Sequence, residues 1–115
     1  MASTFKNQGH TVGFLDNSTG NVYTCPGSTQ AVLHAIYISN KSSTNEADVN
    51  VKVTTDGGST FYHVGRKLNV PVDNTLTLDK PVNLEAGDIL RIYAEPTPDS
   101  SSIDLEAFIS ILEIS

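Results

Sequence analysis

The sequence predicts an all-β protein, an antiparallel β-sandwich of about eight strands with a polar N-terminal arm. Val, Ile and Thr make up about a quarter of the 115 residues, and β-branched side chains favour strands over helices. Turn signals rich in Gly, Pro, Asn and Asp recur about every 8–12 residues, the spacing expected of sandwiches and small barrels. Both a jelly-roll and an immunoglobulin-like arrangement fit this pattern.

The N-terminal arm is predicted to span residues 1–20, and the sandwich domain residues 21–115. The arm is polar apart from one apolar patch between Val12 and Leu15. It either packs one short strand against its own chain or reaches a neighbouring subunit, because a polar segment alone buries too little apolar surface to become ordered. Phe14 and Leu15, in the apolar patch, are therefore candidate interface residues.

The strands of the domain are predicted at 22–25, 31–39, 47–54, 60–70, 74–78, 82–84, 89–94 and 103–114. Segment 31–39 is apolar on both faces, with Ile36 and Ile38 sharing one face with Val32 and His34, so it is predicted to be a central strand. In segment 47–54, Val residues alternate with Asp48, Asn50, Lys52 and Thr54, which predicts one buried face and one face in solvent. Gly65 is expected to mark a bulge.

The last predicted strand has apolar residues on both faces. One face fits the core and consists of Leu105, Ala107, Ile109 and Ile111. The other face carries the large apolar side chains of Phe108, Leu112 and Ile114. Either the chain itself covers this second face, or these three residues form a subunit interface, since contiguous exposed apolar patches mark interaction sites.

No segment of the sequence predicts a catalytic residue, a cofactor or a metal site. His10, His34 and His63 lack the close spacing to further ligands that zinc sites show. Cys25 is the single cysteine, which excludes an internal disulfide, and no basic residue near it would activate the thiol. The expectation is a protein that is not an enzyme and has no small-molecule substrate.

The charge and hydropathy patterns argue against two classes of partner. The formal net charge is −6, whereas a nucleic-acid binder needs a basic surface. No apolar stretch approaches the ~18 residues of a membrane span, and the N-terminus does not resemble a secretory signal. We therefore expect neither a nucleic-acid partner nor a membrane partner.

Five segments in order carry a family resemblance. They are Val-Tyr-Thr-Cys-Pro at 22–26, Leu-His-Ala-Ile-Tyr-Ile-Ser-Asn at 33–40, Ala-Asp-Val-Asn-Val-Lys-Val at 47–53, Leu-Glu-Ala-Gly-Asp-Ile-Leu at 84–90 and Leu-Glu-Ala-Phe-Ile-Ser-Ile-Leu-Glu at 105–113. Over roughly residues 21–115 the chain resembles small virion structural proteins of tailed bacteriophages. The resemblance implies a capsid cement or decoration protein on the capsid surface. Its implied partners are its own copies, often as a homotrimer, and the major capsid protein.

Two other functions stay open from the sequence. The chain could serve the tail, neck or fibre of the same particle, because no motif indicates a location. It could also be a carbohydrate- or receptor-binding module that uses Tyr37, Tyr62 or Tyr93 to stack on sugar rings. Under the cement hypothesis, deletion of residues 1–20 is predicted to weaken binding to particles and to leave the sandwich folded.

Overall fold

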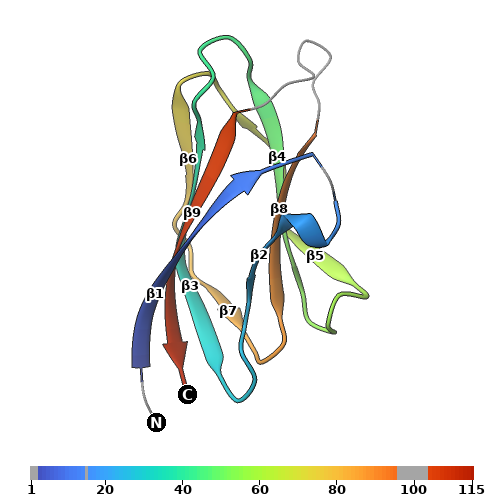
Figure 1. Ribbon diagram of the computed structural model, residues 1–115, viewed down its shortest axis with the longest axis vertical. Helices are drawn as coiled ribbons and strands as arrows, with labels where there is room; N and C mark the ends of the chain where they lie inside the picture. The colour runs from blue at the N-terminus through green and yellow to red at the C-terminus, as the bar shows by residue number, and fades with distance from the viewer. Residues whose placement is uncertain (1–2, 15, 96–103) are drawn as a thin grey trace.

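The computed structural model describes residues 3–14, 16–95 and 104–115, and this part of the chain forms nine strands and one 3-10 helix (Figure 1). The strands are β1 (Ser3–Val12), β2 (Asn21–Thr24), β3 (Gln30–Asn40), β4 (Ala47–Thr54), β5 (Phe61–Val70), β6 (Asn74–Leu78), β7 (Val82–Leu84), β8 (Ile89–Glu95) and β9 (Leu105–Ile114). The helix η1 spans Ser18–Gly20. Ile103, the expected start of the last strand, lies outside the described residues.

Two antiparallel sheets pack against each other, which confirms the predicted β-sandwich. The first sheet has the strand order β1-β9-β3-β6, and β7 also pairs with β3. The second sheet has the order β2-β8-β4-β5. In Figure 1 the first sheet lies on the left and the second on the right.

The strands pair in a nested order along the chain. β1 pairs with β9, β2 with β8, β3 with β6 and β7, and β4 with β5. This is the pattern of one long antiparallel ribbon, which then folds over so that β9 also pairs with β3 and β8 with β4. A ribbon rolled in this way is a jelly roll. Of the two arrangements that fit the sequence, the jelly roll is therefore the one observed.

The N-terminal segment packs as a strand against its own chain, which is one of the two alternatives that the sequence leaves open. Residues 3–12 pair with β9 at ten consecutive positions, from Ser3 opposite Ile114 to Val12 opposite Leu105. Most β1 side chains are exposed on both faces, and only Val12 is buried. The sequence of β1 is therefore polar because the strand lies at the edge of the sheet, where main-chain hydrogen bonds rather than apolar burial hold it.

The core lies between the inner faces of the two sheets. The residues below 2% exposure include Leu33, Ile38, Val49, Val51, Leu90, Ile92, Ile109 and Ile111. They come from the four strands at the centre of the sandwich, β3, β4, β8 and β9. Burying each such side chain stabilises the fold by roughly 1.5–3 kcal/mol relative to leaving it exposed.

Strand β3 is central, as predicted, but a bulge partway along it changes which alternate residues point into the core. The register with β9 shifts between Leu33 and Ala35, so that His34 is the extra residue of a bulge. As a result, Leu33 and Ile36 both point into the core, although an unbroken alternation would place them on opposite faces. The predicted grouping of Val32 and His34 with Ile36 and Ile38 is therefore wrong.

Strand β5 contains the expected irregularity near Gly65. The register with β4 shifts around Val51, and Lys67 has a positive φ of 49°. A Cβ atom on Gly65 would clash with the end of the Leu68 side chain, so a larger residue there requires that side chain to shift. The Asn50 side chain accepts a hydrogen bond of 3.0 Å from the Lys67 backbone N–H, which replaces a ladder bond lost at the bulge.

The polar face of β4 is not in solvent, contrary to the prediction. Asn50, Lys52 and Thr54 are only 2%, 8% and 0% exposed. The bulged β5 strand covers Asn50, and the turn after β4 covers Thr54, whose hydroxyl accepts a hydrogen bond from Gly58. Lys52 lies under Asp16, in the connection that follows β1.

Candidate assembly surface

The outward face of the first sheet carries a row of apolar side chains across three strands. Phe5 on β1 pairs with Leu112 on β9, and Leu112 pairs with Val32 on β3. In a second row Phe108 on β9 pairs with Tyr37 on β3. Directly opposed side chains on one face of a sheet lie about 4.5–5.5 Å apart at Cβ, so each row forms a continuous surface.

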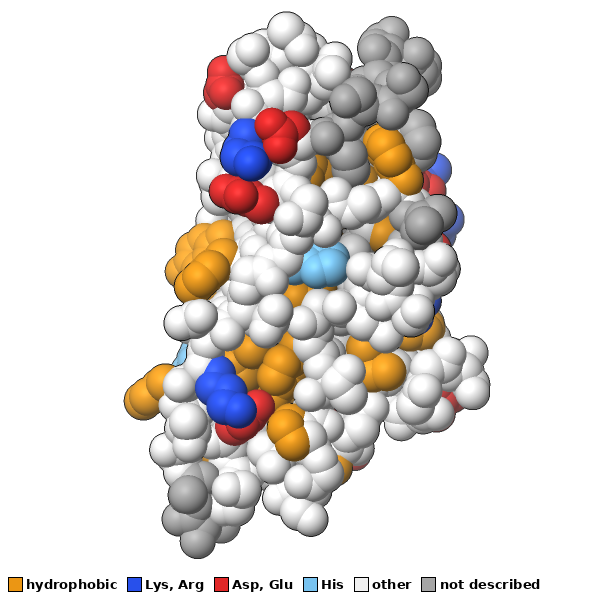
Figure 2. Space-filling model, viewed as in Figure 1, with side chains coloured by type: hydrophobic (Ala, Val, Ile, Leu, Met, Phe, Trp, Pro, Cys, Tyr) orange, Lys and Arg blue, Asp and Glu red, His pale blue; other side chains and the backbone are white. Residues whose placement is uncertain are grey.

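We call this surface the outer patch, and its members are Phe5, Val32, Tyr37, Phe108, Leu112 and Ile114. Phe5, Phe108 and Tyr37 are 80%, 48% and 40% exposed. In Figure 2 hydrophobic side chains project from the left margin of the molecule, on the side of the first sheet. Exposed aromatic side chains that gather on one face are a feature of interaction surfaces, so the outer patch is a candidate for one.

Acidic side chains on and next to β9 lie near the two ends of the outer patch, and they pair with lysines. At one end, Lys41 Nζ lies 3.4 Å from an oxygen of Asp104 and 3.6 Å from an oxygen of Glu106. Near the other end, Lys6 Nζ lies 3.0 Å from Glu113, but this pair is on the inward face of the sheet. Between these pairs the rows carry aromatic, aliphatic and small polar side chains. Covering the middle of the patch therefore does not bury an unpaired charge.

A shallow hollow of about 260 Å³ lies beside the second row. Its walls include Gly9, Thr11, Tyr37, Ser39, Glu106 and Phe108. At Gly9 the hollow is open, because nothing lies within 4 Å of a Cβ atom placed there. Because small-molecule sites usually enclose about 300–1,000 Å³, the hollow suits a single side chain of a partner better than a ligand.

The structure brings three of the five predicted interface residues together. Phe108 is exposed on the outward face of β9, and Leu112 and Ile114 are half-buried on that same face. Phe14 is half-buried and packs against the core, away from this surface. Leu15 lies outside the described residues.

Two aromatic members of the outer patch were not predicted as interface residues. Phe5 lies in the segment predicted as an arm, and the outward exposure of Tyr37 follows from the bulge at His34. Phe5 also approaches His34, with 6.3 Å between ring centroids. An aromatic residue among the polar residues that precede Val12 is the sequence signal that could have identified Phe5.

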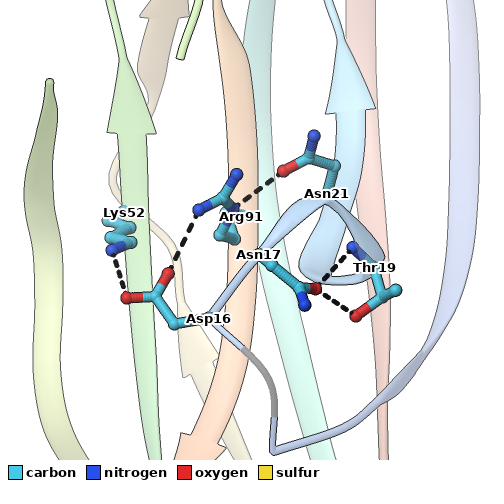
Figure 3. Close-up of polar contacts among 6 residues, drawn as sticks. All are labelled: Asp16, Asn17, Thr19, Asn21, Lys52 and Arg91. Atoms are coloured by element: carbon cyan, nitrogen blue, oxygen red, sulfur yellow. Dashed lines mark hydrogen bonds and ion pairs between the residues drawn. The ribbon is translucent and has the colours of Figure 1, made fainter. Parts of the chain in front are cut away.

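A cluster of charged and polar side chains on the outward face of the second sheet holds the β1–β2 connection in place (Figure 3). Asp16 Oδ2 lies 2.8 Å from Lys52 Nζ on β4, and Asp16 Oδ1 lies 3.1 Å from Arg91 Nη1 on β8. Arg91 Nε also donates to Asn21 Oδ1 at 2.8 Å. The Phe61 ring lies beneath both cations, 4.8 Å from Lys52 Nζ and 4.2 Å from Arg91 Cζ.

The charged side chains of this cluster form ion pairs with one another. Burial raises the pKa of Asp16, but the hydrogen bonds and charges of Lys52 and Arg91 outweigh burial and hold that pKa below its ordinary value. The side chains of Lys52 and Arg91 are 10% and 13% exposed. A cation buried to this degree needs a counter-ion. We therefore interpret the role of the cluster as structural: it holds the β1–β2 connection against β4 and β8.

Glu113 links β1, β2 and β9 at the far end of the sandwich. The Tyr23 hydroxyl, on the second sheet, donates a hydrogen bond to Glu113 on the first. Lys6 on β1 forms an ion pair with the same carboxylate. The hydrogen bonds from Tyr23 and Lys6 lower the pKa of Glu113. The side chain of Lys6 is thus directed inward and does not reach the outer patch.

The surroundings of the single cysteine do not favour a reactive thiol. Cys25 is buried, and burial, followed by the charges of Glu113 and Asp88, raises the pKa of its thiol. A raised pKa disfavours the thiolate that a nucleophile needs. Among residues 3–14, 16–95 and 104–115, no three His, Cys, Asp or Glu side chains gather as a metal site would require.

Comparison with protein-family models and with curated proteins finds no match to this chain. Within the described part of the chain, no helix has the length and apolar character needed to cross a membrane.

Proposed function

We propose that this chain is a non-enzymatic structural protein of a tailed-phage virion and that it acts as a capsid cement protein. In this role it self-associates and binds neighbouring subunits of the major capsid protein on the capsid surface. The observation that carries the proposal is the outer patch, an apolar face with exposed aromatic residues and paired charges around it. The resemblance of five segments to virion structural proteins supports a tailed-phage particle as the setting.

The physical basis of cement activity is linkage. A protein that binds the assembled lattice and not its separated subunits stabilises the lattice by mass action. The outer patch supports such binding because its uncharged middle is covered at little desolvation cost. A net charge of −6 also disfavours direct contact with the packaged nucleic acid.

Imaging of labelled protein on virions tests the proposal. Tyr62→Cys provides a label site, since Tyr62 is 61% exposed on β5 of the second sheet and the native Cys25 is buried. Label distributed over the head is the expected result. Label confined to the tail would replace the cement role with the tail, neck or fibre alternative, and absence from particles would contradict a virion role altogether.

A further inference from the structure

Strand β1 is the one long and regular strand edge in the described part of the chain. It pairs with β9 at ten consecutive positions without a register shift, and β9 is its only neighbour in the sheet order. It contains no proline, and its one charged side chain, Lys6, is turned toward Glu113. Proteins usually protect such an edge with a bulge, a proline or an exposed charge. Strand β1 has neither a bulge nor a proline, and its one charge, the half-exposed Lys6, is paired with Glu113 of its own chain.

The other sheet edges carry that protection. β2 has four residues and an irregular register with β8. β5 is bulged near Gly65 and carries Arg66 and Lys67 at the bulge. β6 and β7 are five and three residues long, and Asp79, Lys80 and Pro81 separate them. The contrast identifies β1 as the edge that is left free to accept another strand.

We propose that β1 pairs antiparallel with β1 of a second copy, about a two-fold axis at Asn7. This contact rests on the self-association part of the proposed function and not on the location in a phage. A two-fold contact uses the same surface twice, so the edge of β1 must be complementary to itself. The positions of Phe5 and Gly9, two residues on either side of Asn7, provide that complementarity.

In this register Phe5 of one copy faces Gly9 of its partner on the outward face. Gly9 is where the hollow beside Phe108 and Tyr37 is open, and nothing lies within 4 Å of a Cβ placed there. Rotation of the Phe5 side chain away from His34 carries its ring across the strand gap and over Gly9 of the partner. An aromatic ring that covers a glycine on the neighbouring strand is a known stabilising pair in sheets.

The charges of β1 also fit this register. Lys6 faces Gln8 of the second copy rather than another Lys6, and it keeps its own Glu113. Two Phe5 rings would bury roughly 300–500 Å² in addition to the main-chain ladder. The two outer patches would become one continuous face, with β9 and β3 of each copy on either side of the paired β1 strands.

Light scattering on the purified chain over a concentration series tests the contact. We expect a mass that rises from one chain toward two. Phe5→Ser and Gly9→Val should each weaken association by about tenfold or more, because one removes the ring and the other fills its site. In the single copy nothing lies within 4 Å of a Cβ atom at position 9, so circular dichroism of Gly9→Val should show an unchanged fold.

A pair of cysteine substitutions tests the register. Asn7→Cys places two thiols opposite each other across the axis, within disulfide range for directly opposed antiparallel residues, whereas Thr11→Cys on the same face places them far apart. Mild oxidation should cross-link the Asn7→Cys variant much faster than the Thr11→Cys variant. A monomer at every concentration, equal cross-linking of the two variants, or a dimer or trimer that neither Phe5→Ser nor Gly9→Val affects would overturn the proposal.

Discussion

The carboxylate of Asp16 lies 2.8 Å from the ammonium group of Lys52, so the connection after β1 supplies the counter-ion for a cation buried on β4. Asp16→Asn removes that charge from both Lys52 and Arg91. We expect a loss of about 1–3 kcal/mol in the free energy of unfolding, because two poorly exposed cations lose their partner. Urea denaturation measures this loss.

Asp104→Asn is the matched control for this substitution. Asp104 also pairs with a lysine, Lys41, but the two side chains are 57% and 52% exposed. An exposed pair contributes little, so this variant should stay within about 0.5 kcal/mol of the wild type. Equal losses for Asp16→Asn and Asp104→Asn would contradict the structural role of Asp16.

Two truncations distinguish the contribution of strand β1 to stability from that of the ion pairs between Asp16, Lys52 and Arg91. Deletion of residues 1–8 removes exposed side chains and keeps Val12 and Asp16, so the chain should stay cooperatively folded. Deletion of residues 1–20 also removes the buried Val12 and the partner of Lys52. We expect a much lower melting temperature for the longer deletion, which revises the sequence-based prediction that the sandwich tolerates it. Similar melting temperatures for both truncations would show that the connection contributes no stability.

His10 makes stability depend on pH. Its Nε2 atom is buried without a hydrogen-bond partner, and burial lowers its pKa below the ordinary value of 6.5. Protonation therefore costs more in the folded chain than in the unfolded chain. The contribution of neutral His10 is fully present above about pH 6.5 and is lost as the pH falls through the folded-state pKa.

Thermal unfolding between about pH 7.5 and about pH 5 measures this dependence, above the range where most carboxylates titrate. His10→Gln should flatten the fall in melting temperature over that window. His63→Gln, which changes an exposed histidine on β5, should keep the wild-type slope. Retention of the full slope in His10→Gln would assign the dependence to other groups.

The positions of the strands along the chain could be predicted from the sequence, because turn residues and short apolar runs are local signals. Each of the eight predicted strands is present within one or two residues of its expected bounds where the structure describes them. The ninth strand, β1, was predicted only as one of two alternatives, and only as a short strand, because its stability comes from pairing with β9. That pairing requires residues about a hundred positions away, and the polar β1 side chains give no sign of it.

Which face is buried was harder to predict than where the strands lie. Alternation in β4 correctly predicted the inward Val49 and Val51, but the burial of Lys52 depends on Asp16, which is distant in the chain. In β3 the bulge at His34 reverses the alternation and exposes Tyr37. The outer patch was predicted from Phe108, Leu112 and Ile114 because the two faces of the last strand are both apolar. Its Phe5 and Tyr37 members depend on cross-strand register.

Phe108 offers a direct test of the outer patch on particles. Phe108→Ser removes an aromatic ring that is 48% exposed, so the fold should remain and binding to particles should weaken by about tenfold or more. Tyr62→Ser, at a side chain 61% exposed on β5 of the second sheet, is the matched control and should bind as the wild type does. Equal weakening by the two substitutions would mean that the outer patch is not the contact surface.

The copy number of the chain on purified virions, measured by quantitative mass spectrometry and assigned to head or tail by fractionation, tests the proposed function most directly. The cement proposal predicts many copies in the head fraction, in proportion to the major capsid protein. A few copies that follow the tail fraction, or no copies in the particle, would contradict it.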